Sequence, residues 1–93
     1  MKFMMTFKWT PDTQRRAEGF ARFTRTGGLP PDGVRLLGRW TQADLAGGFD
    51  LLETDDPGKL AEFAYAWSDL MELKITPILE DAQLGAALQH AMH

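Results

Sequence analysis

The order of strand-like and helix-like patterns of apolar residues is the feature that most constrains the fold of this chain. Residues 3 to 9 carry a large apolar side chain at every odd position, which is the spacing of a strand with one buried face. Three further short apolar runs, bounded by turn-forming residues, are predicted to be strands, at 34 to 42, 49 to 54 and 71 to 78.

Three stretches between and after these strands have the end signals of helices. The first is predicted from Thr13 to Thr26, where Asp12 or Thr13 can cap the free N–H groups and Gly27 can end the helix. The second begins at Asp56-Pro57, since proline is tolerated at the first helical position. A short third helix is predicted from about Asp81 to Met92. The apolar stripes are Ala17, Phe20, Ala21 and Phe23 or Thr24 in the first helix, and Leu60, Phe63, Ala64 and Trp67 in the second.

Placed in chain order, these elements read β-α-β-β-α-β with an added C-terminal helix. This is the ferredoxin-like α+β arrangement, and we expect its four strands to form one antiparallel sheet. A length of 93 residues suits one small domain. Residues 1–93 are therefore predicted to form a single ferredoxin-like domain.

Two helices cover only one face of such a sheet, so the other face must meet water, a ligand or a partner. Apolar side chains fall on both faces: Met4 lies opposite in sense to Phe3 and Met5, and Leu37 opposite in sense to Trp40. A large exposed apolar face normally marks an interaction surface, and a chain this short gains stability from association. A homodimer through the open sheet face is therefore predicted.

Charge and cysteine content exclude several classes of function. The formal net charge of -3 and the pI near 5.2 argue against a nucleic-acid partner, because such proteins neutralise phosphates with a cationic surface. The chain has no cysteine, which excludes disulfides, zinc–thiolate sites and thiol nucleophiles. Its two histidines, His90 and His93, do not make a ligand set, so no metal and no other cofactor is expected.

The sequence also has no pattern that indicates a membrane protein. No apolar run approaches the ~18 residues that a bilayer-spanning helix needs. The amino terminus, MKFMMTFKW, lacks the long apolar region and cleavage site of a signal peptide. A cytoplasmic location without a membrane partner is the expectation.

Four strings of the sequence resemble a known family. They are LLGRW (36–40), GGFDLLETDDP (47–57), AWSDLMELKITPIL (66–79) and the GG-PP-GV spacing from 27 to 34. Together they are similar to a family of short bacterial proteins described only as a domain of unknown function, within the dimeric α/β-barrel superfamily. The resemblance covers nearly the whole chain, with E-T-D-D-P and W-S-D-L as its most specific pieces. It implies a ferredoxin-like monomer whose sheets pack face to face in a dimer.

The wider superfamily implied by this resemblance includes cofactor-free monooxygenases, haem-degrading enzymes, chlorite-dismutase-like proteins, muconolactone isomerase-like enzymes and plain ligand binders. Many of its members have a histidine or another polar residue just after the tryptophan of the second strand. Here Thr41 and Gln42 follow Trp40. This departure argues against transferring histidine-based chemistry to the chain.

The hairpin of the second and third strands holds the one group of residues that suggests a ligand site. If its turn is centred on Asp44 to Gly47, Trp40 faces Leu51 and Gly38 faces Glu53 across the strand pair. Gly38 then leaves space opposite the carboxylate, with the indole of Trp40 beside it. Such a group suits a small ligand with a hydrogen-bond donor, and makes Glu53 a candidate general base or acid.

A structural explanation of these residues stays open. Glu53 can lie at a solvated strand end, or pair with Arg35, Arg39 or a lysine of the first strand. Three functions are consistent with the sequence. The first is binding of a small molecule in the sheet or dimer cavity, with Trp40, Gly38 and Glu53 as ligand-binding residues. The second is a cofactor-free monooxygenase or isomerase with Glu53 as its base, and the third is an assembly domain without chemistry.

Overall fold

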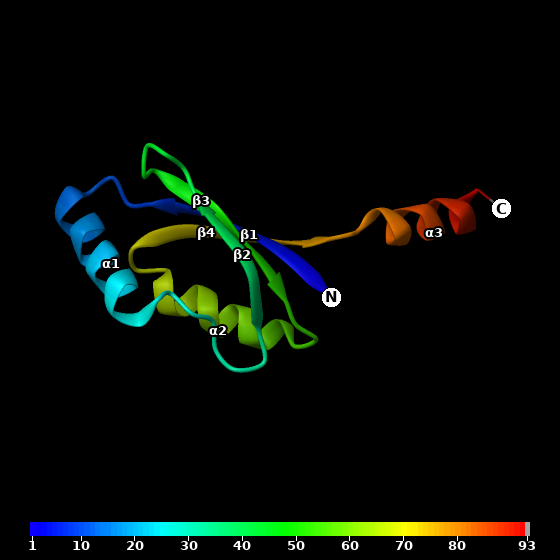
Figure 1. Cartoon of the computed structure of the whole chain (residues 1–93), viewed down its shortest axis with the longest axis horizontal. Coiled ribbons are helices and arrows are strands. Elements are labelled where there is room, and N and C mark those ends of the chain that lie inside the picture. Colours follow the sequence, from blue (N-terminus) through cyan, green and yellow to red (C-terminus); the bar gives the residue numbers. More distant parts are fainter. Residues whose placement is uncertain (93) are drawn as a thin grey trace.

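The computed structural model of the protein describes residues 1–92, and these form four strands and three helices (Figure 1). The elements are β1 (Lys2–Trp9), α1 (Thr13–Thr26), β2 (Arg35–Thr41), β3 (Gly47–Glu53), α2 (Pro57–Trp67), β4 (Met71–Ile78) and α3 (Asp81–Ala91). Their order is the predicted one, with small shifts at the ends of the elements.

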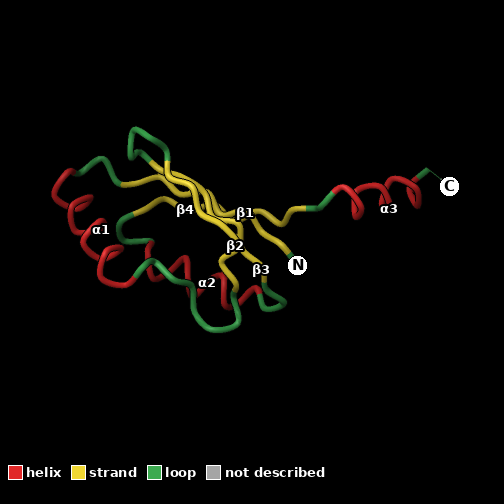
Figure 2. Tube along the Cα trace, in the orientation of Figure 1, coloured by secondary structure: helices red, strands yellow, loops and turns green. Residues whose placement is uncertain are grey.

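The strands form one antiparallel sheet in the order β2-β3-β1-β4. β1 lies inside the sheet and pairs with β3 on one side and with β4 on the other. Figures 1 and 2 show α1 and α2 on the same side of this sheet, which leaves the other face open. The ferredoxin-like α+β fold predicted from the order of elements is therefore confirmed.

The core lies between the sheet and the two helices. The odd residues of β1, from Phe3 to Trp9, are buried, as their spacing predicted. Leu60, Phe63 and Trp67 of α2 pack against them. The start of α2 also follows the prediction, because Asp56 Oδ1 accepts a hydrogen bond from the Gly58 N–H at 2.9 Å and Pro57 is the first helical residue.

α1 meets the sheet differently from the prediction. Ala17 and Ala21 are exposed, and Gly19 is the buried residue of this helix. A Cβ atom at Gly19 would lie 2.2 Å from Cζ3 of Trp9, so the missing side chain is what lets the indole reach the helix. Because this indole fills the space beside Gly19, the two alanines have no sheet surface to pack on, and the alanine part of the predicted stripe is wrong.

The register of the β2–β3 hairpin differs from the predicted one, in which Trp40 faces Leu51 and Gly38 faces Glu53. The turn closes one residue earlier, because the Gln42 N–H donates to the Gly47 carbonyl at 2.8 Å and Leu45 adopts a left-handed φ of 64°. An irregularity at Leu37 then shifts the register again. The facing pairs are Trp40 with Phe49, Gly38 with Leu51, and Arg35 with Glu53.

α3 extends away from the sheet beyond the end of β4 (Figure 1), and residues 79 to 92 are all exposed. The molecule consequently measures 55 × 28 × 18 Å along its principal axes. Within the described part of the chain, no helix is long and apolar enough to cross a membrane.

Candidate ligand-binding site

A cavity of about 280 Å³ lies between the helix-covered face of the sheet and the two covering helices. Trp9 is central to its wall. The centre of its ring lies 4.8 Å from the ring centre of Phe20 and 6.2 Å from that of Trp67. The wall is mainly aromatic, and its apolar members include Phe7, Trp9, Phe20, Phe23, Phe63 and Trp67, with Met5 and Met71. Such a lining favours contact with a flat or apolar molecule.

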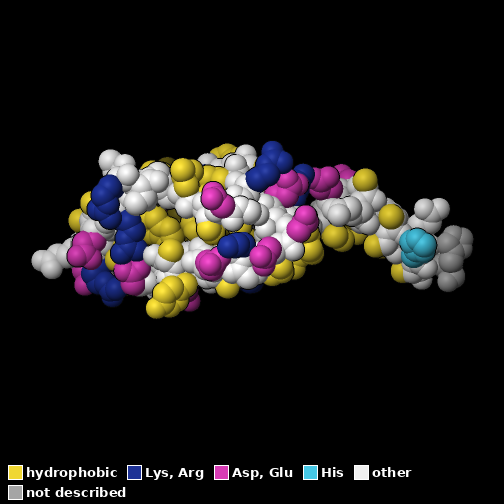
Figure 3. All heavy atoms as spheres, turned by 90° about the horizontal axis from the view of Figure 1, so that it is seen from below, with side chains coloured by type: hydrophobic (Ala, Val, Ile, Leu, Met, Phe, Trp, Pro, Cys, Tyr) yellow, Lys and Arg dark blue, Asp and Glu magenta, His cyan; other side chains and the backbone are white. Residues whose placement is uncertain are grey.

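The mouth of the cavity lies between the C-terminal half of α1 and the β2–β3 hairpin. Three lining residues there are exposed to solvent: Phe23 (41%), Leu45 (51%) and Thr41. Figure 3 views the molecule from the side of the two helices, where hydrophobic side chains are visible between charged ones. A small molecule can therefore reach the aromatic wall from this side.

An ion pair forms the charged part of the cavity lining. Arg39 Nε donates to Asp50 Oδ1 at 2.7 Å, and Arg39 Nη2 donates to Asp50 Oδ2 at 3.1 Å. The Asp50 side chain is 1% exposed and that of Arg39 is 17% exposed. The guanidinium also donates to the carbonyls of Gly27 (3.2 Å) and Gly28 (2.6 Å), and lies 5.3 Å from the ring centre of Phe23.

This arrangement ties the end of α1 to the sheet next to the cavity mouth. The two side chains neutralise each other, so the cavity carries no net charge from them. Both carboxylate oxygens of Asp50 accept hydrogen bonds from the guanidinium, which leaves the carboxylate poorly placed to take a proton from a substrate. The pair therefore shapes and closes one side of the cavity rather than offering a free base.

The three residues singled out in the sequence lie on the opposite, open face of the sheet. Gly38 and Trp40 do come together, but the space over Gly38 is filled, since a Cβ atom there would lie 2.6 Å from Cη2 of Trp40. The Trp40 ring also packs on Phe49, with ring centres 6.0 Å apart. The idea of an open gap over Gly38 is therefore wrong, because the neighbouring indole covers it.

Glu53 lies further along the hairpin, at the end of β3. It faces Arg35 rather than Gly38, and its Oε1 accepts a hydrogen bond from Arg35 Nη1 at 3.1 Å. This is one of the ion pairs that the sequence left open as a structural explanation. Any part of Trp40, Gly38 and Glu53 in binding a ligand stays a prediction, and the register that placed Glu53 opposite Gly38 is wrong.

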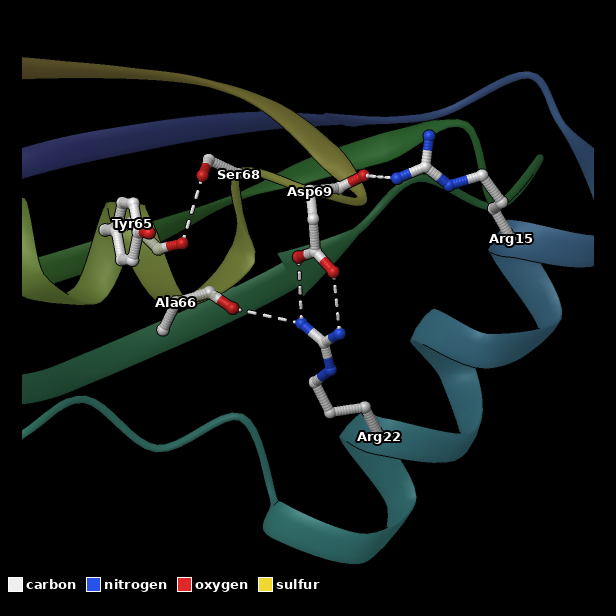
Figure 4. A network of polar contacts seen from close by, with 6 residues as sticks. All are labelled: Arg15, Arg22, Tyr65, Ala66, Ser68 and Asp69. Atoms are coloured by element: carbon white, nitrogen blue, oxygen red, sulfur yellow. Dashed lines mark hydrogen bonds and ion pairs between the residues drawn. The ribbon is translucent and has the colours of Figure 1, made fainter.

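A second polar network holds α1 to the turn between α2 and β4 (Figure 4). Arg22 donates to both carboxylate oxygens of Asp69, at 3.0 and 2.8 Å, and Arg15 donates to the Asp69 backbone carbonyl. The hydrogen bonds from Arg22 lower the pKa of the Asp69 carboxyl, and the same bonds raise the pKa of Arg22. The Arg22 guanidinium also lies 5.2 Å from the Trp67 ring centre.

This network gives the W-S-D-L string a structural explanation. Trp67 is buried beside the cavity, and the Ser68 hydroxyl donates to the Tyr65 carbonyl at 3.0 Å. Asp69 binds Arg22, and Leu70 is 1% exposed in the core. Through Trp67 and Asp69 the string thus contacts Arg22 of α1 beside the cavity.

The histidines lie away from the cavity. His90 is exposed on α3, and His93 lies outside the described residues. Among residues 1–92, no three His, Cys, Asp or Glu side chains gather into a group that could hold a metal ion.

Sequence reasoning missed both the cavity and the Arg39–Asp50 pair. A signal for the pair was present: Asp50 has the same strand parity as the core residue Leu52, and a carboxylate on the core face needs a partner. Arg39 lies directly across from it. The cavity itself had no such signal, because it depends on how far α1 stands from the sheet.

Comparison with solved structures supports the fold. The structure titled "Structure of Rv0793 from Mycobacterium tuberculosis" matches with a TM-score of 0.55, covering 88% of this chain and 99% of that one. The two sequences are 13% identical, so the likeness concerns the fold alone. No curated protein matches the sequence.

Comparison with family models is more specific. Residues 1–92 match the model of DUF3303, which is described as a domain of unknown function. The match extends over nearly the whole length of the chain and agrees with the resemblance seen in its sequence strings. The chain therefore belongs to the DUF3303 family.

Proposed function

We propose that this protein binds a small, largely apolar molecule in the cavity between the sheet and helices α1 and α2. The observation that carries the proposal is the cavity itself, with about 280 Å³ of space and an aromatic wall that opens to solvent. Ligand sites in proteins are typically apolar clefts of ~300–1,000 Å³ with a few polar groups. The cavity lies just below this range, so a molecule of one or two fused rings suits its size.

The polar groups near the mouth suggest how such a ligand lies. Thr41, which is exposed, and Arg39, whose guanidinium lies 5.3 Å from the ring centre of Phe23, are polar residues of the lining. The deep wall around Trp9 and Phe63 is apolar. The ligand is thus expected to place a hydroxyl or carbonyl group at the mouth and its hydrocarbon part inside.

The pairing of the carboxylates favours a binding function over a catalytic one. Asp50, in the cavity lining, has both oxygens bound to Arg39, and Glu53 is paired with Arg35 on the other face of the sheet. The cofactor-free monooxygenase or isomerase reading needs a free base beside the substrate. Neither carboxylate meets this need in the arrangement observed.

Titration with 2-naphthol, followed by ¹⁵N-edited NMR, tests the cavity. We expect saturable shifts at amides around Phe20, Phe63 and Trp67. A Phe23→Trp variant should narrow the mouth and weaken binding at least several-fold. Tyr65→Trp adds the same indole at a residue of α2 that is 84% exposed and outside the cavity lining, and should leave binding unchanged.

Two results would contradict the cavity proposal. One is the absence of saturable shifts at millimolar probe. The other is a set of shifts confined to Trp40, Phe49 and Leu51, which would place the ligand on the open face of the sheet instead.

We further propose that the chain forms a homodimer through its open sheet face. The support is an apolar patch on that face, which we call the open-face patch and which comprises Met4, Trp40, Phe49 and Leu51. Trp40 is 53% exposed and Phe49 42% exposed, and charged side chains border the patch. Apolar patches with a polar rim are typical of protein–protein interfaces.

A further inference from the structure

The C-terminal arm, residues 79 to 92, packs against no other element in the described part of its own chain. α3 has no buried residue, and Leu79, Leu84 and Leu88 are 58%, 45% and 50% exposed. The radius of gyration is 15.5 Å, whereas a compact chain of this length has about 12 Å. The arm is the part of the molecule that extends beyond the compact body (Figure 1).

The base of the arm is nevertheless held in a defined direction. The Glu80 carboxylate accepts a hydrogen bond from Lys2 Nζ, and the Glu80 N–H donates to Gln83 Oε1 at 2.9 Å. An isolated helix shorter than ~12–15 residues is marginal in water, and α3 has 11. Its apolar stripe is therefore expected to gain its stability from another surface, and comprises Leu84, Ala87, Leu88 and Ala91.

The open face of the sheet changes character from one end to the other. The cross-strand row nearest the arm is charged, with Arg35, Glu53 and Lys2 side by side. The open-face patch lies in the next two rows. Lys74 lies at the β4 side of the second of these rows, opposite Thr6, and Lys8 and Glu72 face each other in the row beyond.

Along its length, the arm carries charged and apolar groups in an order that complements the open face of the sheet. Glu80 and Asp81 lie at its base, the apolar stripe follows, and the C-terminal end of a helix carries a partial negative charge. An 11-residue helix is about 16 Å long. The rows of the sheet from Lys2 to Lys8 span about 20 Å, so the helix fits within the face.

We infer that each arm lies over the open face of a second copy of the chain, with Leu84 and Leu88 on the open-face patch of that copy. The inference rests on the dimer proposed above and specifies what covers the face. Glu80 keeps its contact with Lys2 of its own chain, Asp81 at the acidic base meets the exposed Arg35 of the second copy, and the helix end meets Lys8 and Lys74. Direct stacking of the two sheets would instead leave the arm leucines in water.

Sedimentation velocity of the full chain, across a range of micromolar concentrations, gives the first test. Leu84→Gln with Leu88→Gln should raise the dissociation constant of the dimer at least tenfold. The matched control, Ala82→Gln with Ala86→Gln, alters the opposite side of the same helix and should change it less than twofold. A wild-type chain that stays monomeric would overturn both the dimer and the arm exchange. A dimer whose dissociation constant is unchanged by the leucine substitutions would overturn the arm exchange alone.

A mixed-label NMR experiment shows where the arm lies. The chain has no cysteine, so Gln89→Cys carries a single nitroxide label on the solvent side of α3. Labelled chains at natural isotope abundance are mixed with unlabelled ¹⁵N chains. We expect broadening of ¹⁵N amides at Met4, Phe49 and Leu51. Broadening that occurs only when label and isotope are on the same chain would mean that the arm folds back on its own sheet, and would overturn the inference.

Discussion

Single glycines decide how closely the layers of this protein approach. Gly19 lies where the Trp9 indole touches α1, and a Cβ atom there would be 2.2 Å from Cζ3 of that ring. Gly85 lies on α3, where a Cβ atom would meet nothing within 4 Å. The same substitution should therefore have opposite effects at the two positions.

Gly19→Ala is expected to destabilise the fold by about 1–3 kcal/mol, as overpacking a filled site does. Gly85→Ala is expected to be neutral or to stabilise α3 by up to about 1 kcal/mol, because alanine is the better helix former. Urea denaturation at one fixed protein concentration measures both. Equal losses at the two positions would show that Trp9 has room to move away from α1.

The Arg39–Asp50 pair leads to a second prediction at the scale of residues. Arg39→Met leaves a carboxylate that is 1% exposed without its partner, which should cost about 3–5 kcal/mol. Arg35→Met removes a side chain that is 75% exposed, and should cost under about 1 kcal/mol. The double change of Arg39→Met with Asp50→Leu should recover much of the loss, since it leaves no unpaired charge. The free energy of unfolding in urea compares the three variants, and similar losses for Arg39→Met and Arg35→Met would contradict the role given to the pair.

At the scale of elements, sequence reasoning succeeded where a local pattern determines the structure. The odd residues of β1 and the Asp56-Pro57 start of α2 depend on neighbours in sequence, and both were predicted correctly. The hairpin register was not predictable in this way. It depends on the left-handed backbone of Leu45 and on the irregularity at Leu37. Leucine is not a residue type that predicts either feature.

The candidate site was harder to predict for a related reason. Its cavity arises because Trp9 fits against Gly19 and sets how α1 lies over the sheet, which is a contact between distant elements. The residues that the sequence favoured, Trp40, Gly38 and Glu53, were chosen by a hairpin register that the structure does not have. A buried acid at Asp50 was the sequence signal closest to the cavity.

The attachment of α1 to the α2–β4 turn should depend on pH. The Asp69 carboxyl has a pKa below its ordinary value of 3.8, because Arg22 donates hydrogen bonds to its charged form. Its contribution to stability is therefore present above 3.8 and is lost as the pH falls through the lower value of the folded state. The side chain is 51% exposed, so the contribution is expected to be under about 1 kcal/mol.

Comparing the wild type with Asp69→Asn measures the contribution of the Asp69 carboxylate to stability. The stability difference between them, from urea denaturation, should be largest near neutral pH and should shrink below pH 3.8. A difference that stays constant down to pH 2 would mean that the Arg22 pair adds nothing to the folded state.

At the scale of the whole molecule, an open apolar face and an exposed helix on one chain suggest that association completes the fold. The melting temperature of a protein that is stabilised by dimerisation rises with its concentration. We expect such a rise for the wild type. Phe49→Glu should remove it by placing a charge in the open-face patch, whereas Tyr65→Glu, at an 84% exposed residue of α2, should keep it. A melting temperature independent of concentration in the wild type would argue for a stable monomer.

The cavity mouth and the arm lie at opposite ends of the sheet, one beside the β2–β3 hairpin and the other beyond β4 (Figure 1). Substitutions that reshape the mouth, at Phe23 or Leu45, touch no residue of the arm. The ligand preference and the assembly proposed above can therefore diverge independently among family members. Comparing many DUF3303 sequences should show two separately varying sets of positions, one at each end of the molecule.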